Sequence, residues 1–403
     1  MNKPADKQVS LRRDLSDPLP IPDAGIDKAI EIMRSGRLFR YGEFSGGASE
    51  VALLERDFAA LLGRRYAAAF NSCGSAIFVA LKCVGIQPGD SVLVNGFTLA
   101  PVPGAIEHAG AKPVFVECAD ECRIDLQDLE SKAAGGARVL LMSHMRGHLA
   151  DMDAVVAICE RAGIVLVEDC AHTLGARWNG RLSGTFGSIS CFSLQSFKHI
   201  NAGEGGVLVT DDDDIAAQAI LYSGSYMLYA QNGARPDLEV FERYKRDIPN
   251  LSLRMHELTA AVARPQLDLL ASRVRQWARN YDLLARLLDE INEVQVAQRL
   301  RGEDYVGSSI QFRILSLAPG QICNVLDACG KRGVDIKWFG RNEAQGFTST
   351  WRDWRYVCDP QDLSQTTRML ERLCDMRIPI DLDREEAGII AQIISEEIAA
   401  HSA

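Results

Sequence analysis

The sequence predicts an α/β protein with a large, mostly parallel sheet covered by helices, followed by a smaller C-terminal α+β part. Short, almost wholly apolar runs recur through the first two thirds of the chain, and helix-period segments lie between several of them. A long amphipathic segment then leads into a second set of strand and helix patterns. Continuous apolar strands are typical of sheets buried on both faces. A chain of 403 residues suits one large domain and one smaller domain.

We expect residues 1–25 to form an arm, residues 26–265 the large domain, and residues 266–403 a bridging helix with the small domain. Residues 151–163 have a helical period, with Asp151 placed to cap the helix start and Gly163 to stop it. The acidic run 211–214 fits a solvated turn and helix cap. The expected strands of the large domain are 91–97, 112–117, 138–144, 164–170, 188–194 and 206–210.

Residues 263–291 read as one long amphipathic helix that contains Pro265 and bridges to the small domain. That domain should hold a strand at 309–317, a helix at 320–333 and a closing helix at 384–400. The segment 336–356 is rich in tryptophan and arginine. Its arginines would suit a sugar phosphate or an acidic sugar, but aromatic packing of a folded loop explains the composition equally well.

Composition excludes several classes of function. The net charge of −10 and the lack of a basic block argue against nucleic-acid binding. No apolar run reaches the roughly 18–20 residues that span a bilayer, and the polar N-terminal stretch lacks the apolar core of a signal peptide, so we expect a cytoplasmic protein. Cys118 and Cys122 have no second pair to complete a zinc site, and we expect no metal.

Ligands of open α/β sheets bind beyond the carboxyl ends of the strands. Asp169 stands at such an end, and its neighbour Glu168 should face the other side of the sheet because side chains alternate. His172 follows three residues later. A helix cap for Asp169 and an ordinary core or surface position for His172 are the plain alternatives.

The next strand places Ser193 and then Lys198 before the run Gly203–Gly206. A lysine after a strand is usually a solvated surface charge. Three glycines in the four residues 203–206, however, indicate that backbone approaches a ligand closely, or that a loop folds around one.

The stretch 71–85 begins with small polar residues and continues as an apolar helix. Free amides and the positive dipole at such a start can hold a phosphate, and a plain N-cap is the alternative. A phosphate seat, a carboxylate, a histidine, a serine and a lysine together match the needs of pyridoxal phosphate. That cofactor bonds to a lysine, takes a carboxylate on its ring nitrogen and needs donors for its phosphate.

Several motifs, in the right order and with the right gaps, resemble the DegT/DnrJ/EryC1/StrS family of pyridoxal-phosphate-dependent sugar aminotransferases, which have fold type I. The resemblance covers roughly residues 25–400. The motifs that carry it are "GIQPGDSVLV" (85–94), "GHLADMDAV" (147–155), "VEDCAHTLGA" (167–176), "FSLQSFKHINAGEGGVLVT" (192–210) and "LRMHELTAAVARPQL" (253–267).

The resemblance implies that Lys198 bonds the cofactor and later shuttles the proton, and that Asp169 pairs with the ring nitrogen. Burial and neighbouring positive charge should lower the pKa of Lys198. The remaining expected cofactor contacts are His172 near the ring's 3-oxygen and, at the phosphate, Ser193, Gly74 and Ser75.

The sequence departs from the family pattern at several positions. Cys73–Gly74 replaces a Gly-Thr pair, Leu99 replaces an aromatic that stacks on the ring, and Ser223–Gly224 replaces a His-Gly pair. The family's Asn-Tyr-Arg motif, whose Asn reaches the neighbouring subunit's phosphate, is here 252–254, so either Ser252 or Asn250 must substitute.

Relatives with histidine in place of the lysine are dehydratases, and here His199 follows Lys198 directly. The spacing from Phe192–Ser193 favours Lys198. The resemblance thus implies transfer of an amino group from glutamate or glutamine to a keto-sugar that is nucleotide-linked, phosphorylated or a free acid. It also implies a homodimer with the active site at the subunit interface, to which residues 223–256 contribute.

Two alternatives stay open at this point. One is a sugar dehydratase or lyase that uses the same cofactor. The other is a non-enzymatic pyridoxal-phosphate-binding regulator, for which the chain lacks an evident DNA-binding segment.

Overall fold

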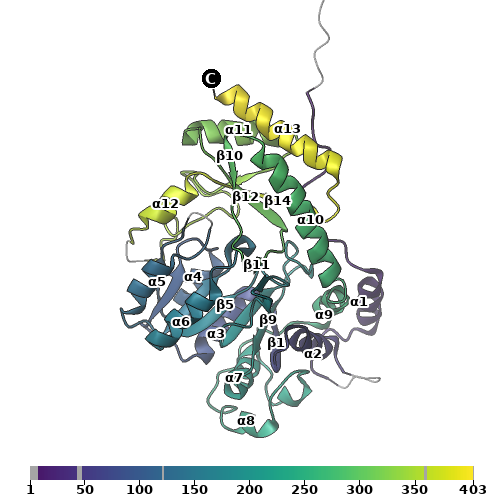
Figure 1. The fold of residues 1–403 in the computed structure, drawn as a ribbon. Coiled ribbons are helices and arrows are strands. Elements are labelled where there is room, and N and C mark those ends of the chain that lie inside the picture. Colours follow the sequence, from purple (N-terminus) through teal and green to yellow (C-terminus); the bar gives the residue numbers. More distant parts are fainter. Residues whose placement is uncertain (1–7, 43–47, 120–121, 358–360, 403) are drawn as a thin grey trace, which may run out of the picture.

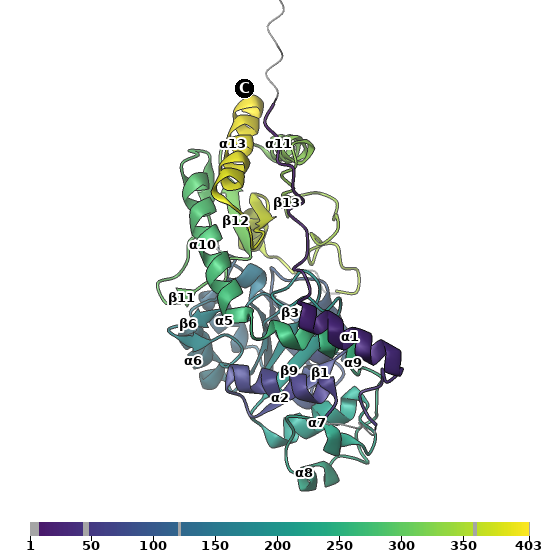
Figure 2. The ribbon, with the colours of Figure 1, turned by 90° about the vertical axis from the view of Figure 1, so that its right-hand side faces the viewer.

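The computed structural model describes residues 8–42, 48–119, 122–357 and 361–402. Of the expected arm, residues 1–7 lie outside these ranges. Residues 8–22 form neither helix nor strand and run along the small C-terminal sheet (Figure 2). The Leu11 amide donates to the Arg332 carbonyl at 2.8 Å, and Leu11, Leu15 and Leu19 are buried. This segment is therefore packed onto the C-terminal part by apolar side chains and backbone hydrogen bonds.

A seven-stranded sheet among the described residues forms the centre of the large part (Figure 1). Its order is β1-β9-β8-β5-β4-β2-β3, and β9 is antiparallel to both of its neighbours, while β8, β5, β4, β2 and β3 are parallel. The prediction of a mostly parallel sheet is confirmed. The strands are β1 (Tyr66–Phe70), β2 (Ser91–Asn95), β3 (Lys112–Val116), β4 (Val139–Ser143), β5 (Val165–Asp169), β8 (Ile189–Ser193) and β9 (Gly206–Thr210).

Six of these strands fall within the predicted runs, but β1 was missed. Its sequence is Tyr-Ala-Ala-Ala-Phe, and alanine is depleted in strands. All five residues are buried, so the small side chains let helices pack close to this strand.

Helices cover both faces of the sheet. Asp151 accepts a hydrogen bond from the Ala154 amide, and Gly163 ends the same helix with φ 65°, so both predicted caps are confirmed. Asp212, within the acidic run 211–214, caps α7 (Asp213–Ser223) by accepting a hydrogen bond from the Ile215 amide. The helices of this part are α1 (Asp23–Ser35), α2 (Glu50–Leu62), α3 (Cys73–Cys83), α4 (Pro101–His108), α5 (Leu126–Ala133), α6 (Met152–Ala162), α7 (Asp213–Ser223), α8 (Leu238–Glu242) and α9 (Glu257–Ala263).

Short elements connect these helices and strands. The strands β6, β7 and β11 make a small separate sheet. Their bounds, with those of the 3-10 turns, are η1 (Met145–Gly147), β6 (Arg177–Trp178), β7 (Arg181–Leu182), η2 (Tyr229–Gln231), η3 (Arg264–Gln266) and β11 (Glu303–Asp304).

The C-terminal part is an antiparallel sheet, β10-β12-β14-β13, with α10, α11 and α13 packed beside it (Figures 1 and 2). The predicted strand at 309–317 and the helices at 320–333 and 384–400 are confirmed within a few residues. The elements are α10 (Leu270–Asp289), β10 (Val294–Val296), β12 (Ser309–Ile314), α11 (Pro319–Lys331), β13 (Lys337–Trp338), α12 (Ser364–Leu370), β14 (Leu373–Arg377) and α13 (Arg384–His401).

The long helix expected over 263–291 is shorter than predicted. It begins at Leu270, and the 3-10 turn η3, which contains Pro265, separates it from α9. Proline has no amide hydrogen to donate, and its ring clashes with the carbonyl four residues before it, so the helical pattern is interrupted there. The domain boundary expected at 265–266 falls within this turn.

No helix among the described residues is long and apolar enough to cross a membrane.

Candidate active site

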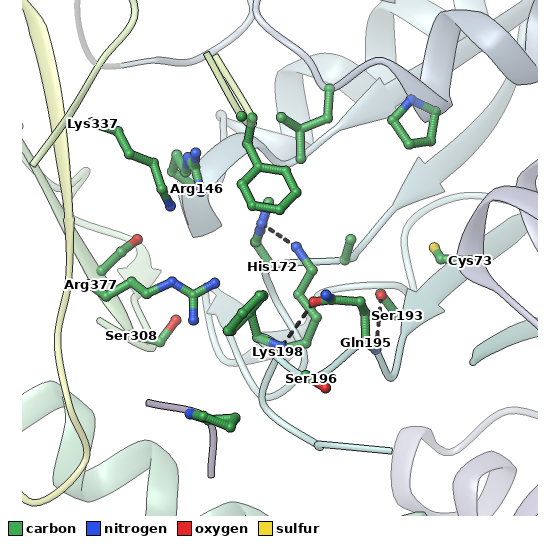
Figure 3. Close-up of a pocket in the computed structure, with 18 of the residues that line it drawn as sticks. Cys73, Arg146, His172, Ser193, Gln195, Ser196, Lys198, Ser308, Lys337 and Arg377 are labelled. Carbon is green, nitrogen blue, oxygen red and sulfur yellow. Dashed lines mark hydrogen bonds between the residues drawn. The ribbon is translucent and has the colours of Figure 1, made fainter. Parts of the chain in front are cut away.

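A cavity of about 440 Å³ lies beyond the carboxyl ends of β5 and β8, between the central sheet and the C-terminal part (Figure 3). It brings together residues from distant parts of the chain. Its polar lining residues are Asp17, Ser72, Cys73, Arg146, Asp169, His172, Ser193, Gln195, Ser196, Lys198, Glu204, Ser308, Ser309, Lys337, Ser349 and Arg377.

Lys198 follows β8 in a turn whose backbone is fixed by a 2.9 Å hydrogen bond from its own amide to the Gln195 carbonyl. Its Nζ lies 2.5 Å from His172 Nε2 (Figure 3). Burial lowers the pKa of Lys198 to about 7, helped by the charge of Arg146 and opposed by Asp169. The expected lowering is confirmed, and a large share of this lysine is a neutral amine near pH 7.

His199, the neighbour of Lys198, does not line the cavity. Its Nε2 lies 2.9 Å from the Ser308 hydroxyl, and its ring packs against Trp277. The two adjacent residues therefore point to different environments, and only Lys198 reaches the cavity.

His172 lines the cavity beside Lys198. Burial lowers the pKa of His172 well below its usual value, and the nearby charges of Lys198 and Arg146 lower it further. Its imidazole is therefore neutral at neutral pH and can exchange a hydrogen bond with the amine without adding charge.

Asp169 is the last residue of β5, and it pairs across the parallel ladder with Ser143, the last residue of β4. Its Oδ2 accepts from the Ser143 hydroxyl at 2.7 Å, and its Oδ1 accepts from the Ala171 amide at 3.1 Å. The Ser143 hydroxyl also lies 2.8 Å from that of Thr98. Both oxygens of Asp169 are thus held, so the carboxylate has a fixed orientation at the cavity wall. Sequence reasoning missed Ser143, although the ends of parallel strands meet at one edge.

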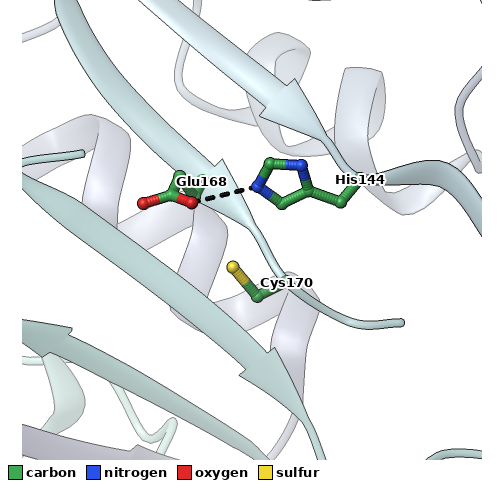
Figure 4. Close-up of side chains that lie close together, drawn as sticks. All are labelled: His144, Glu168 and Cys170. Carbon is green, nitrogen blue, oxygen red and sulfur yellow. Dashed lines mark hydrogen bonds and ion pairs between the residues drawn. The ribbon is translucent and has the colours of Figure 1, made fainter. Parts of the chain in front are cut away.

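Glu168 faces the other side of the sheet, as predicted, and lies beside His144 and Cys170 (Figure 4). These are side-chain types that bind metals, but the Glu168 oxygens already accept from His144 Nε2 at 3.0 Å and from three backbone amides at 2.7–3.0 Å. Burial raises the pKa of Glu168, and these hydrogen bonds outweigh it and lower that pKa. The carboxylate therefore anchors the loop 184–187 to β5.

The start of α3 lies at another wall of the cavity, where Ser72, Cys73 and Gly74 line it. Ser72 is the N-cap, and its hydroxyl accepts from the Ser75 amide at 3.0 Å. Ser75 does not line the cavity, and its hydroxyl donates to Asn71 Oδ1 at 2.7 Å.

Ser193, at the end of β8, also lines the cavity and pairs in the ladder with Gly206. A Cβ on Gly206 would lie 2.4 Å from the Ser72 carbonyl oxygen and 2.5 Å from the Cys73 nitrogen. This glycine of the predicted glycine-rich loop is therefore needed where the start of α3 passes over β9. The close approach is between two backbone segments of the chain.

Asn250 and Ser252 are exposed and do not line the cavity. Asn250 Oδ1 accepts from the Tyr226 amide at 3.0 Å, and the Ser252 hydroxyl accepts from Arg254 Nη2 at 3.2 Å. Neither residue meets the other predicted site residues within one chain.

Of the two features that the composition of 336–356 indicated, the structure has aromatic packing, and the segment's arginines do not face the cavity. Trp338, Trp351 and Trp354 are buried, which is aromatic packing. Its contribution to the cavity comes from other positions, including Lys337 and Phe347. The arginines 341, 352 and 355 do not line the cavity.

Three cations of the cavity were not predicted: Arg146, Lys337 and Arg377 (Figure 3). Arg146 lies in η1 with φ 58°, a conformation that sequence patterns do not reveal for arginine. Lys337 and Arg377 belong to β13 and β14, so the antiparallel ladder of the small sheet brings them to the site.

A family model and several individual known proteins match this chain. The family model described as "DegT/DnrJ/EryC1/StrS aminotransferase family" matches residues 24–395. The chain is 31% identical to the spore coat polysaccharide biosynthesis protein SpsC of Bacillus subtilis (strain 168) over 252 residues, 61% of each chain. It is 32% identical to the 3-amino-5-hydroxybenzoate synthase of Amycolatopsis mediterranei (strain S699), covering 68% of this chain and 67% of that one.

Among solved structures, 3-amino-5-hydroxybenzoic acid synthase superposes with a TM-score of 0.81 at 25% identity, over 96% of this chain and 99% of that chain. The expected fold, that of fold type I pyridoxal-phosphate-dependent enzymes, is confirmed. Because the family model covers nearly the whole chain, the protein belongs to the DegT/DnrJ/EryC1/StrS aminotransferase family.

Proposed function

We propose that this protein is a pyridoxal-phosphate-dependent aminotransferase that moves an amino group from glutamate or glutamine to a keto-sugar in amino-sugar biosynthesis. The observation that carries the proposal is one cavity in which a lysine with its pKa lowered to about 7 lies with a strand-end carboxylate and a neutral histidine. The family membership supports the same activity.

The donor set of the cavity fits pyridoxal phosphate. Lys198 offers a partly neutral amine, Asp169 a carboxylate held by two hydrogen bonds, and the start of α3 a cluster of small residues with the positive end of the helix dipole. In this assignment Gly74 and Ser193 contribute to the phosphate seat. Ser75 instead supports the helix start: its amide donates to the Ser72 hydroxyl, and its own hydroxyl donates to Asn71 Oδ1.

When bound, the cofactor would supply an aldehyde that bonds to amines and a ring that withdraws electrons from the carbon undergoing proton loss. Lys198 Nζ would then carry the proton that leaves the substrate carbon bearing the amino group, a role that requires a pKa near the working pH. His172 Nε2 holds that amine in place through the 2.5 Å contact. Asp169 presents a carboxylate of fixed orientation to the ring nitrogen.

Lys198 and His199 are adjacent in sequence, but only Lys198 faces the cavity, and this arrangement favours amino transfer over dehydration. In this proposal the residue that faces the reacting atoms is an amine, and the adjacent imidazole is held outside the cavity by Ser308. A dehydratase of the kind weighed above would need the imidazole in the position of the amine.

We also propose a homodimer in which Asn250 or Ser252 serves the cavity of the other subunit. Both are exposed and lie outside the cavity of their own chain, which leaves them available to a cavity of a second copy. Sedimentation of the loaded protein should give a dimer, and Asn250→Ala with Ser252→Ala should weaken cofactor binding. A monomer that binds the cofactor fully would contradict this arrangement.

The amino-transfer proposal is tested in two half-reactions. Purified protein loaded with pyridoxal phosphate should lose its visible absorption on addition of glutamate or glutamine. The desalted product should then regain it with a keto-sugar, and mass spectrometry should find the amine in the sugar product. Loss of a water molecule from the sugar without gain of nitrogen would instead establish the dehydratase.

A further inference from the structure

The cavity wall opposite the start of α3 carries more positive charge than the proposed cofactor chemistry uses. Arg146, Lys337 and Arg377 gather there, across Lys198 from Cys73 and Ser193 (Figure 3). In the proposed assignment the phosphate of the cofactor would lie at the other wall. These three cations, which we call the cation wall, are therefore left without an assigned ligand anion.

One buried carboxylate faces the cation wall. Asp375, 1% exposed, lies 3.3 Å from Arg146 Nη2 and 3.7 Å from Lys337 Nζ through its Oδ2. Burial raises the pKa of Asp375, but the charges of Arg146 and Lys337 outweigh it and lower that pKa, so this group is ionised. A single buried carboxylate therefore faces the three cations, and the fully exposed Asp14 adds only a charge interaction with Arg377.

The partners of Arg146 are incomplete among the residues that the structure describes. It is 8% exposed, and neither its Nε nor its Nη2 has a partner in hydrogen-bond geometry. Arg377 rests on the Phe197 ring, with Cζ 3.9 Å from the ring centroid, and within the described chain it forms no ion pair. Leaving a buried guanidinium N–H without an acceptor is costly, and a ligand oxyanion would remove that cost.

The other acids that line the cavity do not neutralise this wall. Asp17 and Glu204 are exposed and, in the described part of the chain, make no ion pair with the three cations. Asp169 is held by Ser143 and the Ala171 amide.

We propose that the cation wall binds an oxyanion carried on the carbon skeleton of the acceptor itself, so that the acceptor is an acidic keto compound. This inference rests on the proposed amino-transfer function and narrows its substrate class. A carboxylate and a phosphate monoester share the required chemistry. A sugar whose only charge lies on a distant nucleotide diphosphate does not place an oxyanion there.

The order of the two half-reactions supports an acidic acceptor. A donor such as glutamate can satisfy the cation wall with its own carboxylate, but it leaves before the acceptor binds. A neutral acceptor would then leave Nε and Nη2 of Arg146 without a hydrogen-bond acceptor during the second half-reaction, with Asp375 as the only carboxylate within ion-pair distance among the described residues. An acidic acceptor would supply an oxyanion to the cation wall in both half-reactions.

The first test measures binding and not turnover. Succinate and inorganic phosphate, which carry no amino or keto group, are titrated into the cofactor-loaded protein by calorimetry. We expect succinate binding to weaken about tenfold or more in Arg146→Gln and in Arg377→Gln, since a charge-assisted contact is lost. Arg341→Gln is the matched control, because this guanidinium lies outside the cavity near Asp327, and its affinity should equal that of the parent protein.

Two further measurements keep the binding test decisive. Neutral succinamide should not bind, and the ratio of the succinate and phosphate affinities tells which oxyanion the wall prefers. If Arg146→Gln does not fold because Asp375 loses one of its partners, Arg146→Lys and a substitution of the half-buried Arg377, Arg377→Gln, take its place. Unchanged succinate affinity in Arg377→Gln, or tight succinamide binding, overturns the inference.

The second test separates the acceptor from the donor. Protein that has received its amino group and has been desalted is offered an acidic keto compound and its neutral amide. KM for the acid should rise about tenfold or more in Arg377→Gln while kcat changes little, and the amide should react poorly with both proteins. Equal reaction of acid and amide overturns the inference even when amino transfer itself works. If no amino donor removes the visible absorption of the cofactor, that result counts against the proposed function instead.

Discussion

Replacing Gly206 by alanine tests the close approach between β9 and the start of α3, where we propose the phosphate site. The added Cβ would lie 2.4 Å from the Ser72 carbonyl oxygen, 2.5 Å from the Cys73 nitrogen and 2.5 Å from the Ser72 carbonyl carbon. All three atoms are backbone, so no side-chain rotation relieves the contact, and the first turn of α3 must shift away from β9.

The expected cost comes from overpacking, which typically destabilises by about 1–3 kcal/mol, and a rigid backbone neighbour places this variant at the upper end. For a chain of this size each kcal/mol shifts Tm by roughly 2 °C, so apo-protein Tm should fall by about 4–6 °C. Because the displaced turn carries the proposed phosphate site, cofactor binding should also weaken by about tenfold, a loss of roughly 1.4 kcal/mol.

Gly388→Ala is the matched control. This glycine lies inside α13, and a Cβ there meets nothing within 4 Å, so alanine should stabilise the helix by about 0.5–1 kcal/mol and leave cofactor affinity unchanged. Thermal unfolding and equilibrium titration with pyridoxal phosphate measure both quantities. A Gly206→Ala protein with the Tm and affinity of the parent would refute the argument from the contact distances.

Three further outcomes are expected. Borohydride should fix the cofactor to the parent protein on the peptide that contains Lys198, and Lys198→Ala should lose that adduct; an adduct on another lysine would displace Lys198 from its role. Asp169→Asn should retain cofactor binding within a few-fold and lose amino transfer by about a hundredfold or more, and parental turnover in this variant would contradict the pairing with the ring nitrogen. The rate at which apo-protein captures the cofactor should rise with pH and reach half its maximum near pH 7, because the neutral amine of Lys198 is the reactive form and its pKa is lowered to about 7. In Arg146→Gln that midpoint should move to higher pH, since the charge of Arg146 helps to lower the pKa, and a downward shift or a parental midpoint near pH 10.5 would show that the sign is wrong.

The elements that the sequence predicted well are those with strong local signals. The apolar strands that carry Asp169 and Ser193 alternate with amphipathic helices, and capping residues such as Asp151 mark the helix boundaries. Strand β1 was missed because its alanines carry little strand preference and only tertiary packing holds them extended. The end of α9 and the start of α10 were missed because amphipathic periodicity continues across Pro265.

The candidate site divides in the same way. Asp169 ends β5, His172 lies three residues after it, and Lys198 follows β8, the parallel neighbour of β5, so their meeting at one edge of the sheet was foreseeable. Placing Ser143 beside Asp169 requires knowing the register of β4 against β5, which the sequence of one strand does not encode. Predicting Arg146 as a site residue requires knowing that its own backbone is left-handed. Predicting Lys337 and Arg377 requires knowing that β13 pairs with β14 and that the small sheet packs beside the cavity.

The positions of the charged groups separate two tasks that one cavity must perform. The carboxylate of Asp169 stands at the end of β5 and the amine of Lys198 just after β8, whereas Lys337 and Arg377 stand on the small sheet. If the proposal holds, substitutions in β13 and β14 should alter which acceptor binds while Lys198 and Asp169 keep their backbone positions, although the charge of Arg377 also helps to lower the pKa of Lys198. A laboratory that wishes to retarget this scaffold can confine its first library to those two strands.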